Sequence, residues 1–304
     1  MIVGLGLLAT ALSWAEDVAP ALDPSSIEAQ VAMLAFAVVL LGLGLLQIPL
    51  GRRLDRSLLG PAPPAPSAFR GVDLPFLVGV YVLAQVFVTV AYGWAKTGDL
   101  EPPPEFFDEL GALEVLGITA LGQAIPAAIV VGIAWKRSGG AAALGIRRPT
   151  PGARTSYAVG RYVLALPMLF GLIALTSFLF VILGFDPPAQ DAALLVRDGL
   201  GENPVAIALF VAVLIPLLEE ILFRGLLLEL CVSAMGRLGG IVVSSAVFGA
   251  LHGAAAFLPI FGLALVLSVV KLRTRSLAAV WLIHGLHNGA MTLLLHLGVT
   301  LEAT

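Results

Sequence analysis

The sequence predicts an all-α protein, a polytopic transmembrane bundle of about eight core membrane helices. Of its 304 residues, 59% are hydrophobic and only 12% are charged, whereas soluble domains usually carry about 25% charged residues. Several apolar runs reach the ~20 residues that span a ~30 Å hydrocarbon core. Most charges lie at the ends of these runs. The chain therefore belongs in a membrane.

The composition also excludes some classes of site. The single cysteine, Cys231, excludes internal disulfides and a multi-cysteine metal site. The net charge is −3, with no basic stripe, so no nucleic-acid partner is expected.

The first predicted region, residues 1–28, is an N-terminal apolar segment followed by an acidic loop. Residues 13–15 read Ser-Trp-Ala, which fits a small-x-small cleavage site, but the positively charged start of a signal peptide is absent. We interpret residues 1–15 either as a signal peptide or as an extra membrane segment.

The second region, residues 29–185, contains four apolar spans at about 29–50, 74–95, 113–135 and 156–185. A proline-rich linker at 61–66 cannot be helical throughout. We find no family signature in this region.

The third region, residues 186–304, carries full spans at 205–230 and 276–297 and two shorter ones at 239–252 and 258–270. The shorter spans fall below the ~17 residues of a minimal crossing. We therefore expect them to pack inside the bundle, away from lipid.

Alternating these spans across a membrane places 14 of the 17 basic residues on one side. By the positive-inside rule that side is cytoplasmic. We expect an integral protein of the bacterial inner membrane whose site opens toward the cytoplasm. The 14 residues are Arg52, Arg53, Arg56, Arg70, Lys136, Arg137, Arg147, Arg148, Arg154, Arg161, Arg237, Lys271, Arg273 and Arg275.

Three polar segments lie inside apolar spans, although one buried charge costs at least ~2.5–3.5 kcal/mol on insertion scales. Counting ~1.5 Å per residue from the basic ends puts all of them ~12–22 Å deep, in one slab of the bilayer. The segments are Glu219-Glu220-x-x-x-Arg224, Phe248-x-x-x-His252 and His284-x-x-x-Asn288.

Their spacing favours the hydrolysis of an amide bond. Glu220 and Arg224 stand four residues apart on one helix face and can pair, while Glu219 points about 100° away and can act as a general base. His252 can share a water with that base. His284 and Asn288 can donate hydrogen bonds to a developing oxyanion.

Other interpretations stay open at this stage. The Glu–Arg pair can be structural, and the histidines can be interhelical hydrogen-bonding groups. An ion-coupled transporter can use buried carboxylates as a proton relay, although its polar residues usually occur in both halves of the chain. A non-catalytic immunity or scaffold protein can keep the same fold.

The three ordered segments resemble the motifs of the CPBP family, the CAAX-protease and bacteriocin-processing proteins, also called the Abi or type II CAAX prenyl endopeptidase family. The resemblance covers about residues 190–300. It implies an all-helical intramembrane endopeptidase with a peptide or membrane-protein substrate in the lipid bilayer. It also implies the role of each matching residue. Glu219 would activate the water with His252 as its partner, and His284 and Asn288 would stabilise the oxyanion. Glu220 and Arg224 match the supporting positions of the first motif, and Phe248 matches the aromatic of the second.

Members of this family are commonly described as metalloproteases. The sequence lacks His-Glu-x-x-His, so a standard zincin site is excluded. Glu219, His252 and His284 could still hold Zn²⁺ with water at the fourth position. We prefer chemistry without a metal. His287, which precedes Asn288, is absent from the family pattern and adds a possible metal ligand or hydrogen-bond donor.

Overall fold

The computed structural model describes residues 27–58, 68–101, 103, 106, 109–138, 140, 144–145, 152–185 and 191–302. Within these ranges every regular element is a helix, as the sequence predicts. The predictions for residues 1–15, for the linker at 61–66 and for Arg147 and Arg148 lie outside the described residues.

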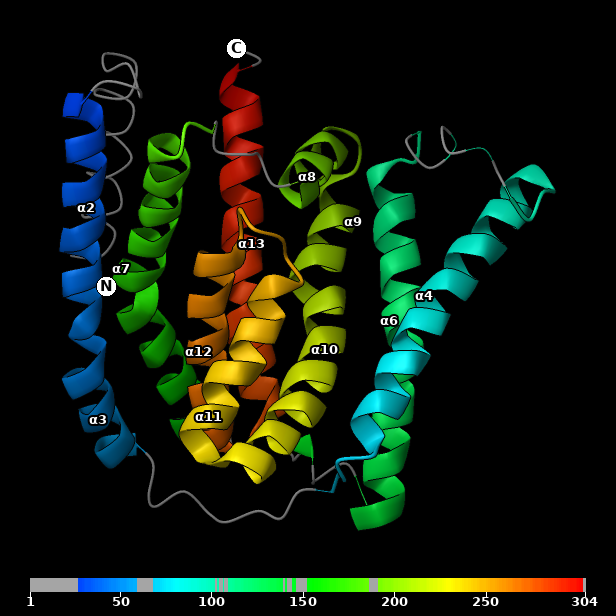
Figure 1. The fold of residues 1–304 in the computed structure, drawn as a ribbon, viewed down its shortest axis with the longest axis horizontal. Coiled ribbons are helices and arrows are strands. Elements are labelled where there is room, and N and C mark those ends of the chain that lie inside the picture. The colour runs from blue at the N-terminus through cyan, green and yellow to red at the C-terminus, as the bar shows by residue number, and fades with distance from the viewer. Residues whose placement is uncertain are drawn as a thin grey trace.

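The described part of the first half of the chain forms five helices, and the longer ones run from one end of the bundle toward the other (Figure 1). Helix α2 packs along α7, where Gly44 approaches the backbone of Met168, the close contact that small residues allow between membrane helices. The elements are α2 (Ile27–Leu45), α3 (Gln47–Leu58), α4 (Asp73–Thr97), α6 (Ala112–Ser138) and α7 (Ala153–Ile182).

The second half holds a long, irregular helical limb, a hairpin and the last helix. The limb consists of α8 (Asp191–Glu202), α9 (Pro204–Leu209), the π-helix η2 (Phe210–Leu214), α10 (Ile215–Glu220) and a second π-helix, η3 (Ile221–Leu227). The hairpin and the last helix are α11 (Leu228–Ala250), α12 (Phe257–Thr274) and α13 (Leu277–Glu302).

Seven helices of the described chain are long and apolar enough to cross a membrane, and one of these, Pro204–Ala250, has 47 residues. At ~1.5 Å per residue it would be ~70 Å long, but it reverses at Gly236, whose φ is 73° and ψ is 177°. This left-handed φ suits glycine. The reversal divides the helix into the two spans that the sequence predicts at 205–230 and 239–252, so the eight predicted spans are eight helical limbs.

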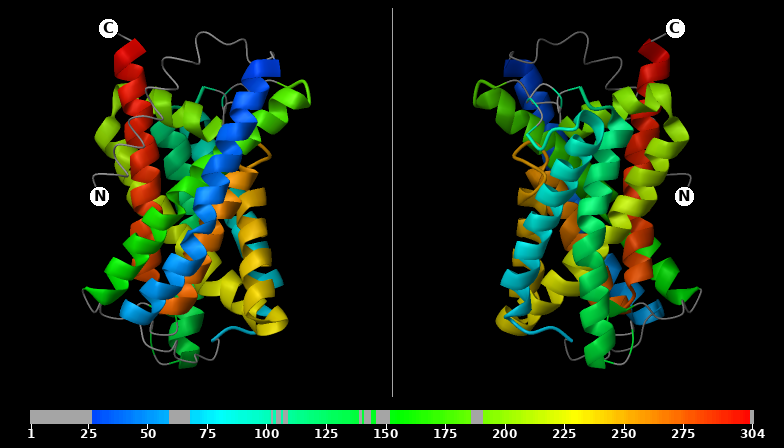
Figure 2. Two further views of the ribbon diagram at one scale, coloured as in Figure 1. Left: turned by 90° about the vertical axis from the view of Figure 1, so that its left-hand side faces the viewer. Right: turned by 90° about the vertical axis from the view of Figure 1, so that its right-hand side faces the viewer.

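The outer helices present apolar side chains outward, for example Val38 on α2 and Leu83 and Phe87 on α4. Such a surface faces lipid. Helix α12 is different, because 56% of its apolar window is buried inside the bundle. The α11–α12 hairpin also turns back before it reaches the upper end of the bundle (Figures 1 and 2). Helix α12 is thus internal, as predicted, but the short limb of α11 is not, because its Val242, Val243 and Val247 side chains are 42%, 38% and 40% exposed.

The ends of the limbs agree with the predicted alternation. The end of α3, the start of α4, the end of α6, the start of α7 and the α12–α13 connection all lie at the lower end in Figure 1. These are the segments that carry most of the basic residues. The acidic loop after α4 and helix α8 lie at the upper end. The protein is thus an integral membrane protein with one basic end.

Candidate active site

The two predicted catalytic carboxylates lie on α10, a single stretch of six residues between the π-helices η2 and η3. Pro216 stands in the first turn of α10 and has no N–H to donate to the preceding turn. A proline therefore accounts for the irregular helix immediately before the carboxylates. Isolated π-turns often occur at functional sites.

Glu220 is completely buried and makes two charged contacts. Its Oε1 lies 3.2 Å from Nη1 of Arg224 and accepts a hydrogen bond of 2.7 Å from Nδ1 of His284. Arg224 is 2% exposed, and its guanidinium lies 4.3 Å above the ring of Phe248, a cation–π contact. The pair that the sequence predicts is thus formed, and it also holds a histidine of α13.

Glu219 faces the other way, toward two imidazole rings. Its Oε2 lies 3.7 Å from Nε2 of His284, and its Oε1 lies 4.0 Å from Nε2 of His252. The side chain of Glu219 is 12% exposed and that of His252 is 32% exposed. Glu219 therefore stands between two histidines at a point that solvent or a substrate can reach.

The partners of the two rings define which nitrogen carries the proton. Nδ1 of His252 lies 2.7 Å from the carbonyl oxygen of Phe248, which can only accept, so Nδ1 donates. Nδ1 of His284 donates to the Glu220 carboxylate in the same way. In the neutral rings both Nε2 atoms then present a lone pair toward Glu219.

His252 owes its position to the end of α11. The helix ends at Ala250, and Gly253 has a positive φ of 82°, typical of the residue that follows a helix C-terminus. His252 is therefore held just past the last helical turn, where its ring packs against that of Phe248 with centroids 4.6 Å apart and planes tilted by 51°.

The structure gives Asn288 and His287 other contacts. Nδ2 of Asn288 donates to the carbonyl oxygen of Val211 in η2 at 3.1 Å. Nδ1 of His287 lies 3.2 Å from the hydroxyl of Tyr162 on α7. Asn288 thus uses one of its two N–H groups on the backbone, and His287 joins α13 to α7.

Some contacts of the site were not predicted from the sequence. Phe223 packs edge-on against Phe248 with ring centroids 4.7 Å apart, and Trp281 donates to the carbonyl oxygen of Val213 at 2.9 Å. Pro216 is the one sequence signal that pointed to these free backbone oxygens, because a proline disturbs the preceding turn.

The donor types around Glu219 fit zinc, since two imidazole nitrogens and a carboxylate face one another and each ring is oriented by an acceptor at Nδ1. As they stand, however, the described residues contain no group of three or more His, Cys, Asp or Glu side chains arranged to hold a metal ion. The prediction of Zn²⁺ at Glu219, His252 and His284 stays a prediction.

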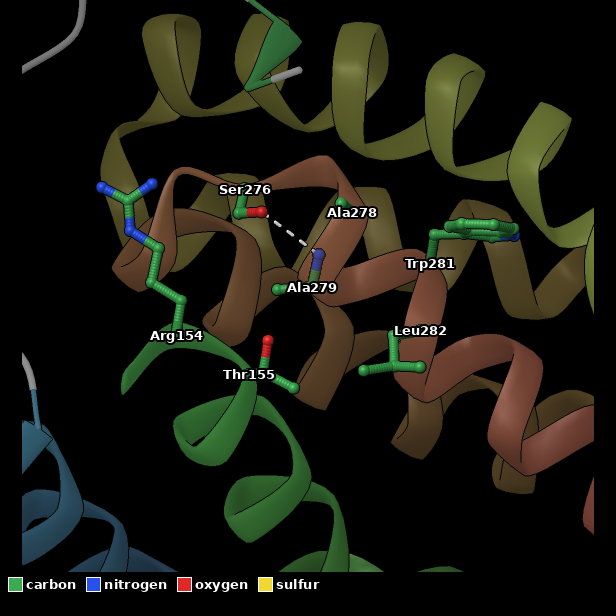
Figure 3. Close-up of a pocket in the computed structure, with 7 residues that line it drawn as sticks. All are labelled: Arg154, Thr155, Ser276, Ala278, Ala279, Trp281 and Leu282. Atoms are coloured by element: carbon green, nitrogen blue, oxygen red, sulfur yellow. Dashed lines mark hydrogen bonds between the residues drawn. The ribbon is translucent and has the colours of Figure 1, made fainter. Parts of the chain in front are cut away.

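A separate cavity of about 220 Å³ lies where α7 and α13 begin, and Figure 3 shows it. Neither Glu219 nor the two histidines line it, so it is distinct from the carboxylate site. Its wall consists of Arg154, Thr155, Ser276, Ala278, Ala279, Trp281 and Leu282.

Comparison with known proteins gives one result. Residues 201–290 match the family model described as "Type II CAAX prenyl endopeptidase Rce1-like". No curated protein and no solved structure matches the chain. The matched residues contain all three polar motifs. The recognition suggested by the motifs is thereby confirmed: residues 201–290 carry the pattern of the type II CAAX prenyl endopeptidase Rce1-like family.

Proposed function

We propose that the protein is an intramembrane endopeptidase that hydrolyses peptide bonds of membrane-associated substrates with Glu219 as its general base. One observation carries this proposal: two imidazole Nε2 atoms converge on a single partly exposed carboxylate. A structural ion pair needs one partner, and Glu220 with Arg224 already forms it. Glu219 is therefore left for chemistry.

In the proposed reaction a water lies between Glu219 and His252. Glu219 takes a proton as the water oxygen attacks the carbonyl carbon of the scissile bond. The C–N bond then breaks, and the proton passes to the leaving amine from Glu219 or through Nε2 of His252. The products are a carboxylate and an amine.

The oxyanion of the tetrahedral intermediate requires donors. We assign this role to Nε2 of His284, which donates when it carries a proton and whose ring Glu220 holds in place, and to the second N–H of Asn288. The first N–H of Asn288 is used on Val211, which fixes the plane of the amide. Glu220 and Arg224 act by positioning His284.

If zinc is bound, Glu219, His252 and His284 would hold it, and the metal would supply an activated water and polarise the carbonyl. A metal analysis of the purified protein, followed by activity after chelation and after readdition of Zn²⁺, distinguishes the two versions. Activity that survives complete removal of the metal supports the version we prefer.

The substrate is proposed by chemistry and by the family's name. Prenylated peptides with a CAAX ending are the first probe, because the matching family is described by that activity. With the basic end in the cytoplasm, the site would meet such substrates at the inner face of a bacterial inner membrane. Bacteriocin precursors and other membrane peptides are further candidates.

The test compares Glu219→Gln, which keeps the shape of the side chain, with Asp198→Asn on the exposed part of α8. We expect Glu219→Gln to lose about 10²–10⁴-fold in cleavage while remaining inserted and folded, and Asp198→Asn to keep wild-type cleavage. Quantitative proteomics of cells that carry either variant identifies peptides that accumulate uncleaved. Normal cleavage by Glu219→Gln would refute the proposal.

A further inference from the structure

Helix α13 contacts η2 through Asn288 of the third motif and through two residues outside the three motifs, Trp281 and Gly285. Three consecutive backbone oxygens of η2 are contacted by three residues of α13. These residues are spaced four and three apart, so they lie on one face of α13. The contacts are Trp281 with Val213, Gly285 with Ala212, and Asn288 with Val211. We call this set the α13 clasp.

Two of the three contacts are hydrogen bonds from side chains to backbone. Nε1 of Trp281 donates to the oxygen of Val213 at 2.9 Å, and Nδ2 of Asn288 donates to that of Val211 at 3.1 Å. Such donors are valuable at membrane depth, because backbone oxygens cannot turn to water there. The clasp therefore satisfies oxygens that Pro216 and the π-turn expose.

The third contact is steric. A Cβ placed on Gly285 would lie 2.3 Å from the oxygen of Ala212, a backbone atom that cannot swing aside. Gly289, one turn further along α13, is different, since its Cβ would meet only the Cβ of Ala212 at an ordinary 3.5 Å. Of these two glycines, Gly285 is the one that must be glycine for α13 to approach η2 this closely.

The clasp controls both halves of the site. His284 lies on α13 between Trp281 and Gly285 in sequence, while Glu219 and Glu220 follow η2 within two turns. The distance of 3.7 Å between Glu219 and His284 is therefore set by how α13 rests on η2. Trp281 also lines the cavity in Figure 3, at the end away from Arg154.

We infer that Trp281 and Gly285 are positioning residues for the proposed protease: they fix the register of α13 against η2 and thereby place His284 opposite Glu219. This inference rests on the proposed function only for its effect on catalysis. The packing itself can be tested without a substrate.

The test uses two matched pairs of variants in the full-length protein. Gly285→Ala is compared with Gly289→Ala, and Trp281→Phe, which keeps a ring but loses the donor, is compared with Trp135→Phe on the exposed face of α6. Hydrogen exchange of residues 210–214 reports the packing, and kcat and KM on a prenylated CAAX peptide report the chemistry.

We expect Gly285→Ala and Trp281→Phe to speed exchange in η2 and to lower kcat about 10–100-fold, as a misplacement of ~1 Å does, with KM changed less than about 3-fold. Their controls should match the wild type. Wild-type exchange rates and a wild-type kcat in Trp281→Phe would overturn the inference. If Gly285→Ala does not fold, the result for Trp281→Phe is the one that tests the inference. If the wild-type protein cleaves no substrate, the proposed function fails, while the exchange data still judge the clasp.

Discussion

At the scale of single residues, Glu220 and Arg224 form an ion pair that is closed off from solvent. Burying two charges is costly, and the cost is recovered only when both are well paired. Oε1 of Glu220 has two partners, Arg224 and His284, whereas its Oε2 and both Nη atoms of Arg224 have no hydrogen-bond partner among the described residues. Arg224 adds the face of Phe248. In the proposed reaction Glu220 holds His284, and Glu219 is the carboxylate that reacts.

Glu220→Ala and Arg224→Ala should each destabilise the protein by about 3–5 kcal/mol, because each leaves an unpaired buried charge. The double variant should lose clearly less than the sum of the two. Thermal unfolding in detergent, arranged as a double-mutant cycle, measures this coupling. Additive losses would mean that the two side chains do not interact.

His252→Ala should reduce cleavage by about 10²–10⁴-fold and leave the unfolding temperature nearly unchanged, because the ring is 32% exposed and caps no buried charge. His296→Ala on the upper part of α13 is the matched control and should cleave normally. Equal activity of the two variants would remove His252 from the reaction.

At the scale of elements, a second buried cluster joins the start of α11, before the reversal at Gly236, to the end of α12. Glu229 on α11 accepts from Nζ of Lys271 and from Nη1 of Arg275, each at 3.2 Å. Lys271 is 1% exposed. This cluster ties the limb that carries Glu219 to the end of α12, which leads into α13.

We expect Glu229→Ala to lower stability by about 3–5 kcal/mol, since it leaves Lys271 buried without its carboxylate. Asp198→Ala breaks the exposed pair with Arg197 on α8 and should cost at most about 1 kcal/mol. Unfolding temperatures of the two variants, measured side by side, check this difference. A similar small loss for both would contradict the structural role of the cluster.

At the scale of the whole molecule, the bundle has one basic end and one acidic end. We predict that single cysteines at Arg56 and Arg237 label from the cytoplasm and that those at Asp99 and Arg197 label from outside, in a Cys231→Ser background. All four positions are exposed. A membrane-impermeant maleimide applied to intact cells should modify only the last two. Labelling of both groups from one side would reject the proposed topology.

Much of the architecture could be predicted from the chain. The lengths of the apolar runs predicted the positions of the helical limbs. The alternation of basic and acidic loops predicted at which end of the bundle each limb begins. The i,i+4 spacing of Glu220 and Arg224 gave their pairing, because a regular helix brings such residues to one face. The short span around 258–270 predicted an internal helix, because it cannot cross a bilayer in full, whereas the same prediction for 239–252 was wrong, since that limb keeps an exposed apolar face.

Other features could not be predicted in this way. The sequence indicated His284 as a free donor, but its Nδ1 is bonded to Glu220. Asn288 was expected to face an oxyanion, and one of its N–H groups instead holds η2. The predicted roles of both residues stay predictions, now with a defined geometry around them.

The amino-acid sequence by itself determined that this is an all-helical membrane protein with ionisable groups at one depth, because hydrophobic length and charge are properties of each segment alone. Only the tertiary structure decided that Glu219 faces two histidines, that Glu220 also holds His284, and that α13 rests on three oxygens of η2. The physical reason is that periodicity shows the face of a residue on its own helix, while an extra residue in a π-turn rotates the rest of that helix by about 100°. The partner across the gap is fixed only when the helices pack.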